Sequence, residues 1–217
     1  MNDIKRWARN FAVPNLTSYL CFAMVLIYIA DLLLPAMRPD LEYSLNALFF
    51  FDRGSILSGQ VWRVLTFTAL PINYSPLWFV ISVIVYFTIG RELEGAWGAH
   101  KLTLFLLLEW VLTVAVGFIF GYTGNYNMYL GMFLVYGMIL PHMQFRLFFL
   151  IPVEARYLAI ADMILMILSI FLDHDMSALA AFTAFLIFFG KDLITPIKNR
   201  RRHKQFMNAF KHRNDDK

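Results

Sequence analysis

The chain has 217 residues, of which 59% are hydrophobic and only 16% are charged, and its net charge at pH 7 is +4. So much apolar sequence excludes an ordinary soluble domain of this length. The single cysteine, Cys21, excludes an intrachain disulfide and any metal site that requires two cysteines.

The hydrophobic residues come in blocks separated by short polar breaks, which is typical of a polytopic α-helical membrane protein. A transmembrane β-barrel would instead alternate apolar and polar residues. We therefore predict an all-α membrane domain over residues 16–195, preceded by an N-terminal segment (1–15) and followed by a basic tail (196–217). The blocks predict six spans, at residues 16–34, 77–89, 102–120, 128–140, 157–172 and 178–194.

The first block follows Lys5, Arg6 and Arg9, and in this respect it is similar to a signal peptide. However, the block is too long for the apolar part of a signal peptide, and no small-residue cleavage site follows it closely. We predict that it is retained as the first membrane helix.

The connection between the first two spans, residues 35–76, is too long and too apolar for a simple solvated loop. Its segment Leu45–Phe51 predicts short helices that lie partly in the outer leaflet, with phenylalanines against lipid or the helix bundle. Arg53 and Arg63 also lie in this connection. Each is expected to find polar partners or to extend toward water, because a bare guanidinium in hydrocarbon is costly.

The basic residues divide unequally between alternate connections. With the N-terminus in the cytoplasm, only Arg38, Arg53 and Arg63 of the 19 lysines and arginines fall outside. The positive-inside rule then predicts an even number of spans in the cell membrane, with both termini cytoplasmic. The basic tail fits a topology determinant that attracts anionic lipid headgroups, and we expect no nucleic acid as a partner.

Four residues around the second span form a pattern. Trp62 and Arg63 end the long first connection, and Glu94 and Gly98 follow the second span. Together with the six spans, this pattern resembles the rhomboid superfamily of intramembrane proteases over residues 44–190. The resemblance implies a six-helix bundle with a membrane-embedded first loop, and the short spans are more similar to bacterial than to organellar members.

Active rhomboids carry a serine nucleophile at the start of the fourth span and a histidine base in the sixth. In this sequence the serine position falls on Met132 if the alignment is anchored on Tyr136, and on Phe133 if it is anchored on Gly131. The histidine position falls on Ser177. None of these side chains can perform the chemistry of the residue it replaces.

The oxyanion-stabilising positions of the second span fall on Trp78 and Ser82 by the same resemblance. All four catalytic positions are therefore replaced, and the resemblance implies a pseudoprotease that is not an enzyme and needs no cofactor or metal. The histidines offer no replacement base, because they fall in polar connections or in the tail. They are His100, His142, His174, His203 and His212.

Small residues recur at helical spacing in the sixth span, which predicts close packing against the fourth span through Gly131 and Gly137. Such packing would preserve the scaffold without any catalytic role. The small residues of the sixth span are Ser177, Ala180 or Ala181, and Ala184.

Two acids lie within predicted spans, Glu109 in the third and Asp162 in the fifth. An ionisable group at this depth costs several kcal/mol unless it is paired or neutral, so each is a candidate functional residue. Three interpretations stay open: a neutral or hydrogen-bonded structural group, part of a client-binding or water-lined cavity, or a carrier of ions or protons.

The resemblance implies that the protein binds transmembrane segments of client membrane proteins at a lateral opening near the second and fifth spans, as inactive relatives such as the derlins do. Its expected partners are the lipid bilayer and these clients. One alternative is a divergent active protease with a relocated serine and histidine. The other is a small transporter or channel that uses Glu109 and Asp162.

Overall fold

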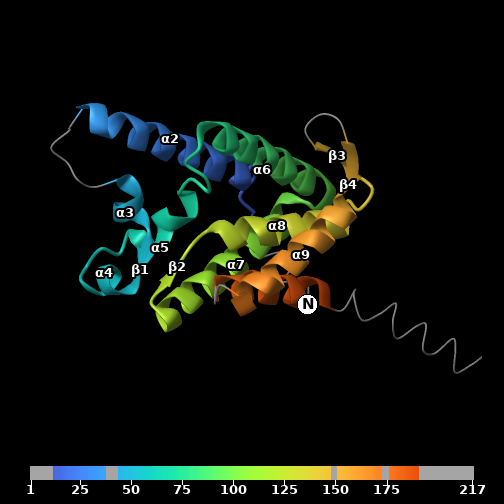
Figure 1. Ribbon diagram of the computed structural model, residues 1–217. Coiled ribbons are helices and arrows are strands. Elements are labelled where there is room, and N and C mark those ends of the chain that lie inside the picture. The colour runs from blue at the N-terminus through green and yellow to red at the C-terminus, as the bar shows by residue number, and fades with distance from the viewer. Residues whose placement is uncertain (1–11, 38–43, 148–150, 173–175, 191–217) are drawn as a thin grey trace, which may run out of the picture. The chain divides into compact units, whose positions relative to one another are not determined.

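The computed structural model describes residues 12–37, 44–147, 151–172 and 176–190 (Figure 1). Helices dominate these residues, and four of them are long and apolar enough to cross a membrane. This finding confirms the helical membrane class that the composition predicts. The four helices are α2 (Leu16–Met37), α6 (Pro76–Trp97), α7 (Ala99–Phe120) and α9 (Ala155–Leu172).

Helices occupy all six predicted positions, but two of them are short. They are α8 (Tyr126–Ile139), which has 14 residues, and the helix Ser177–Gly190. At 1.5 Å per residue α8 extends about 21 Å, whereas the hydrocarbon core of a bilayer is about 30 Å thick. The six-span bundle therefore stays a prediction. The basic tail lies outside the described residues.

The chain divides into two compact units, Met1–Ala184 and Phe185–Lys217. The described part of the second unit is the end of the last helix, where the rings of Phe185 and Phe189 stack with their centroids 5.3 Å apart. All packing described below belongs to the first unit.

The connection between α2 and α6 contains short helices, as the sequence predicts. Its phenylalanines pack inward: Phe51 is fully buried, and its ring meets Phe67 and Phe118 edge-on at centroid distances of 5.5 and 5.4 Å. The short elements are α3 (Leu45–Phe49), β1 (Phe51–Asp52), α4 (Arg53–Leu57), α5 (Arg63–Thr66) and the 3-10 helix η1 (Phe67–Ala69).

Two small β-pairs lie outside the all-α expectation. β1 pairs antiparallel with β2 (Tyr122–Thr123), which ties the first connection to the end of α7. A second antiparallel pair, β3 (Gln144–Leu147) with β4 (Ile151–Glu154), connects α8 to α9. These strands have two to four residues each, so the helical class of the protein is unaffected.

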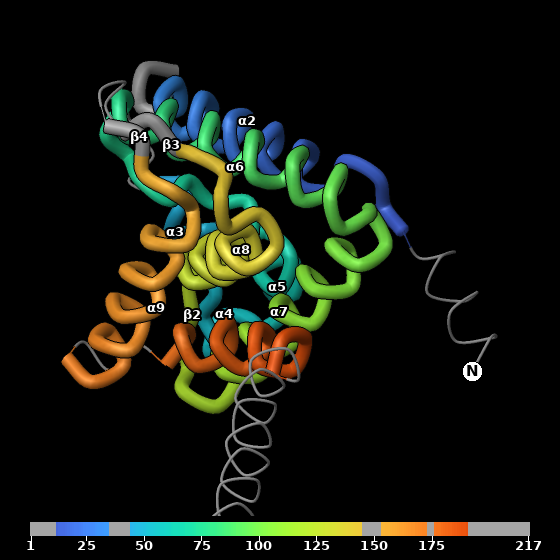
Figure 2. Tube along the Cα trace, turned by 90° about the vertical axis from the view of Figure 1, so that its right-hand side faces the viewer, coloured from blue at the N-terminus to red at the C-terminus, as the bar shows by residue number. Residues whose placement is uncertain are grey.

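Helix α8 lies at the centre of the first unit, and Figure 2 shows it nearly end-on between α6, α7 and α9. It packs against all three of these helices. This position explains how a short helix with polar residues can lie inside a membrane domain, since protein covers most of its surface. The buried residues of α8 are Asn127, Met128, Tyr129, Gly131, Met132, Leu134, Val135, Tyr136 and Gly137.

The glycines of α8 allow close approaches, but only one of them meets the predicted neighbour. A Cβ atom at Gly131 would lie 3.2 Å from the Cβ of Ala181 in the last helix. At Gly137 it would instead overlap the Cβ of Ala159 and lie 3.1 Å from the carbonyl oxygen of Ala155, both in α9. Gly137 therefore packs against the fifth predicted span, and its predicted contact with the sixth is wrong.

Candidate functional site

The buried polar group opposite Ser177 is Asn127, from the first turn of α8. Its Nδ2 donates a hydrogen bond of 2.6 Å to Ser177 Oγ, and both side chains are buried. Met132 is also buried in α8, five residues further along. An asparagine in an apolar helix is visible in the sequence, but its contact with Ser177 depends on how the two helices are aligned.

The other two positions that the resemblance implies lie on α6. Ser82 donates a hydrogen bond of 2.8 Å to the backbone oxygen of Trp78, one turn earlier in the same helix. The side chain of Trp78 is 49% exposed. This bond satisfies the hydroxyl within its own helix, which is a common arrangement for serine in membrane helices.

Arg63 organises the first connection. Its side chain is buried, and its Nη1 donates hydrogen bonds of 2.8 Å to the backbone oxygens of both Ala47 and Phe50. Its Nε donates to Gln60 Oε1, also at 2.8 Å. The predicted need for polar partners is thus met by carbonyls at the end of α3. The neighbouring Trp62 donates its indole N–H to the backbone oxygen of Leu48 at 3.3 Å.

Glu94 and Gly98 shape the cytoplasmic end that the topology predicts. The carboxylate of Glu94 accepts the backbone N–H of Asn15, at 2.9 and 3.0 Å, just before α2 begins. Gly98 separates α6 from α7 and has φ 92° and ψ 142°, a conformation that only glycine adopts without strain. These contacts give the Glu-x-x-x-Gly pattern a structural role.

Glu109 is completely buried in α7. Neither of its carboxylate oxygens has a hydrogen-bond partner among the described residues, and the side chain lies against Gly131 of α8. Thr113, one turn further along α7, is also buried, and its hydroxyl has no hydrogen-bond partner in the described part of the chain. Protein surrounds the carboxyl group of Glu109 on all sides, so Glu109 does not lie on an exposed surface of the described structure.

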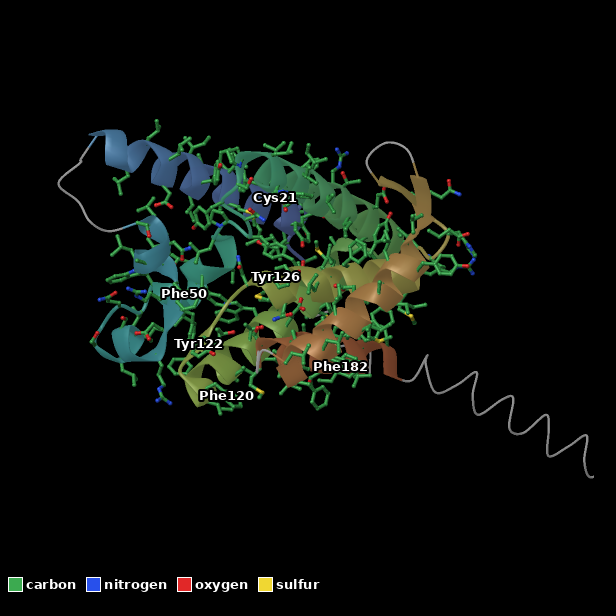
Figure 3. The ribbon with its side chains drawn as sticks, in the orientation of Figure 1. Cys21, Phe50, Phe120, Tyr122, Tyr126 and Phe182 are labelled. Carbon is green, nitrogen blue, oxygen red and sulfur yellow. The ribbon has the colours of Figure 1, made fainter. Side chains whose placement is uncertain are left out.

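Asp162 has different surroundings, because it lines a cavity of about 370 Å³. The walls come from three helices: Tyr86 from α6, Leu130 and Phe133 from α8, and Leu165 from α9. We call this cavity the Asp162 pocket. Tyr126, labelled in Figure 3 at the start of α8, also lines it. The described lining of the pocket is apolar except for the carboxyl group of Asp162 and the hydroxyls of Tyr86 and Tyr126.

The arrangement of helices leaves this pocket between α6 and α9. Both helices pack on α8, whereas direct contact between α6 and α9 in the described part of the chain is at most marginal. Leu165, a lining residue, is 61% exposed, so the pocket opens onto an apolar outer surface. In a membrane such a surface would face lipid.

The described histidines form no catalytic cluster with Ser177. His142 lies beyond α8 beside Glu154, with Nδ1 and Oε2 3.4 Å apart. His100 lies in the first turn of α7. The other three histidines fall outside the described residues. Within the described ranges, no group of three His, Cys, Asp or Glu side chains could hold a metal ion.

No protein-family model matches the chain, and no curated protein matches it significantly. The fold and the pocket define a helical membrane protein with a cavity lined by three of its helices. The rhomboid resemblance rests on the sequence pattern alone.

Proposed function

We propose that this protein is a rhomboid-like pseudoprotease that binds transmembrane segments of client membrane proteins in the Asp162 pocket. The observation that carries the proposal is the position of the pocket. It lies between α6 and α9, which are the second and fifth of the predicted spans, where the resemblance implies a lateral opening.

The surroundings of the pocket support a helix as the occupant. Its lining residues on α8, Tyr126, Leu130 and Phe133, follow one helical face over about two turns. On α9 the same spacing recurs from Leu158 to Leu165. An elongated apolar surface between two helices fits an apolar helix from the lipid phase better than a compact polar ligand.

The absence of proteolysis in this proposal follows from the residues at the aligned positions. Met132 and Phe133 carry no hydroxyl or thiol that could attack a peptide carbonyl, and Ser177 accepts a hydrogen bond from the amide of Asn127. An amide cannot take a proton from serine near neutral pH, so this pair lacks the base that serine catalysis requires.

A transporter that uses both acids receives less support. Glu109 lies against Gly131, whereas the Asp162 pocket is lined by Leu130 and Phe133 on another side of α8. The two carboxyl groups therefore face different neighbours of the same helix. A path for ions would need to connect them through α8.

Client binding is tested by placing a photo-crosslinking amino acid at Leu158 in the pocket and, as a control, at Ile119, which is 68% exposed on α7. In native membranes we expect discrete adducts with membrane proteins from position 158, which disappear when Ala161→Trp fills the pocket. The same adducts from position 119, or none from 158, would overturn the proposal.

The pseudoprotease assignment has its own test. Purified protein in lipid is treated with a fluorophosphonate probe and mixed with a transmembrane substrate, alongside an active rhomboid. We expect neither labelling nor cleavage. Turnover that is lost in Ser177→Ala would favour the divergent protease instead.

A further inference from the structure

Among the described residues that line its pocket, Asp162 is the only acidic one. The residue is only 7% exposed, and its Oδ2 atom has no hydrogen-bond partner among the described residues. Two tyrosines, Tyr86 and Tyr126, line the same pocket, but neither hydroxyl satisfies this oxygen. The lining of this apolar pocket therefore contains a strong hydrogen-bond acceptor without a partner among the described residues.

The carboxyl group lies at a defined depth along α9. Asp162 follows seven residues after the beginning of the helix at Ala155 and ten before its end at Leu172. At 1.5 Å per residue, these separations are about 10 Å and about 15 Å. The acceptor is thus well inside the span and away from both helix ends.

A carboxyl group offers an acceptor to a passing donor in either protonation state. A donor side chain on a client helix faces the same problem as Asp162, since neither group finds a partner in hydrocarbon. Pairing them relieves both costs at once. Hydrogen bonds between membrane helices contribute to association for this reason.

We infer that the Asp162 pocket selects transmembrane helices that carry a hydrogen-bond donor side chain at the depth of Asp162. This inference rests on the proposed function, and it adds the chemical feature by which a client is recognised. The apolar walls pack against the client helix, and Asp162 accepts a hydrogen bond from one polar side chain on it.

The experiment uses the purified full chain in liposomes, labelled with a donor fluorophore for energy transfer. Designed single-span helices of leucine and alanine carry the acceptor fluorophore. One helix carries Asn at its centre, a second carries Leu at that position, and a third carries Asn two turns nearer one end. Energy transfer is measured against the amount of helix per lipid, at densities where the helices do not associate with one another.

We expect the central-Asn helix to bind about threefold to thirtyfold more tightly than the Leu helix, the range for one interhelical hydrogen bond. The advantage should shrink for the displaced Asn. In Asp162→Leu both helices should bind like the Leu helix, whereas Asp162→Asn, which keeps a carbonyl acceptor, should retain part of the preference.

The outcomes separate the two claims. Equal binding of the central-Asn and Leu helices, with both displaced by Ala161→Trp, would overturn the inference and leave the proposed function intact. Binding of neither helix beyond the level seen with Ala161→Trp would overturn the proposed function itself. The depth comparison needs no variant, so the inference can fail even if Asp162→Leu does not fold.

Discussion

At the scale of single residues, the charged side chains in apolar surroundings carry the most information. Arg63 is buried and donates to the backbone oxygens of Ala47 and Phe50 and to the side chain of Gln60. Without the guanidinium, two carbonyls would lose a charged donor. We expect Arg63→Ala to lower the free energy of unfolding by about 3 kcal/mol, measured by denaturant titration in detergent micelles.

The matched control for this variant is Arg53→Ala. Arg53 is exposed and its Nη1 donates a single hydrogen bond of 3.0 Å to the backbone oxygen of Phe118. Its loss should cost about 1 kcal/mol or less. Equal effects of the two variants would contradict the organising role of Arg63.

Replacement of Glu109 is expected to raise the free energy of unfolding, whereas replacement of Arg63 lowers it. The carboxyl group is fully buried and unpartnered in the described structure, so it costs stability that an apolar side chain of similar size would recover. We expect Glu109→Met to raise the free energy of unfolding by about 1–3 kcal/mol. The control Leu106→Met should change it by less than about 1.5 kcal/mol.

Destabilisation by Glu109→Met would mean that the carboxyl group makes a favourable interaction. It would then support a functional role for this acid, in a cavity or in carrying ions or protons. The same detergent titration decides between the two signs.

The sequence alone identified Arg63, Glu109 and Asp162, because a charge is conspicuous in an apolar segment. It did not identify Asn127, since one amide in a helix is unremarkable. The contact between Asn127 and Ser177 depends on the relative alignment of two helices far apart in sequence. Which acid lines a pocket is likewise decided by tertiary packing.

At the scale of elements, the turn between α6 and α7 makes a sharp prediction. Gly98 has a φ of 92°, which strains any residue with a Cβ. We expect Gly98→Ala to lower the free energy of unfolding by about 1–3 kcal/mol. Gly95, three residues earlier in α6, has open space around it. Gly95→Ala should instead raise stability by about 0.5–1 kcal/mol, because alanine favours the helix.

Thermal unfolding of the two variants in the same detergent measures this difference. A neutral Gly98→Ala would show that the turn has a different backbone conformation. A destabilising Gly95→Ala would show that the space around this position in α6 is occupied.

Acid is expected to weaken the cap at the beginning of α4 by protonating Asp52. Asp52 caps this helix by accepting the backbone N–H of Ser55 at 2.6 Å. Hydrogen bonds from the backbone and the side chain of Ser55 hold the pKa of the carboxyl group below its ordinary value of 3.8. A lowered folded-state pKa means that the contribution to stability is complete above 3.8. The contribution is lost as the pH falls through the folded-state pKa. Asp52 is partly buried, and the effect is confined to the beginning of α4.

We expect the NMR signal of the Ser55 amide to shift as the pH is lowered, with the midpoint of the shift below 3.8. In Asp52→Asn, which keeps a capping oxygen but does not titrate, the shift should be absent. A midpoint at or above 3.8 in the unmodified protein would contradict the assigned hydrogen bonds.

The helices of this protein could be predicted from blocks of apolar residues, whereas its strands could not. β1 and β2 have two residues each and pair across a separation of about 70 positions, Phe51 with Thr123. Strands this short carry no alternation of apolar and polar residues. They exist because the first connection packs against the end of α7.

At the scale of the whole molecule, the central question is whether α8 crosses the membrane. Alone it is too short, at about 21 Å, for a hydrocarbon core of about 30 Å. Its neighbours α6, α7 and α9 are longer and cover most of its surface, so lipid need not fit its length. A buried short helix can therefore span where an isolated one could not.

The exposed positions on either side of α8 can be used to test whether this helix crosses the membrane. Tyr122 precedes α8 and is 61% exposed, and Met143 follows it and is 41% exposed. The six-span topology places Tyr122 outside and Met143 in the cytoplasm with both termini. The only cysteine, Cys21, is buried, and its replacement by alanine provides a background for single-cysteine variants.

We expect a membrane-impermeant thiol reagent to label Tyr122→Cys in intact cells and to label Met143→Cys only after the membrane is opened. This difference follows if α8 crosses the bilayer inside its cover of neighbouring helices. Labelling of both positions from the same side would mean that α8 enters and leaves on one face. The number of spans would then be odd, so the termini would lie on opposite sides, and the bias of lysine and arginine to one side would lose its explanation.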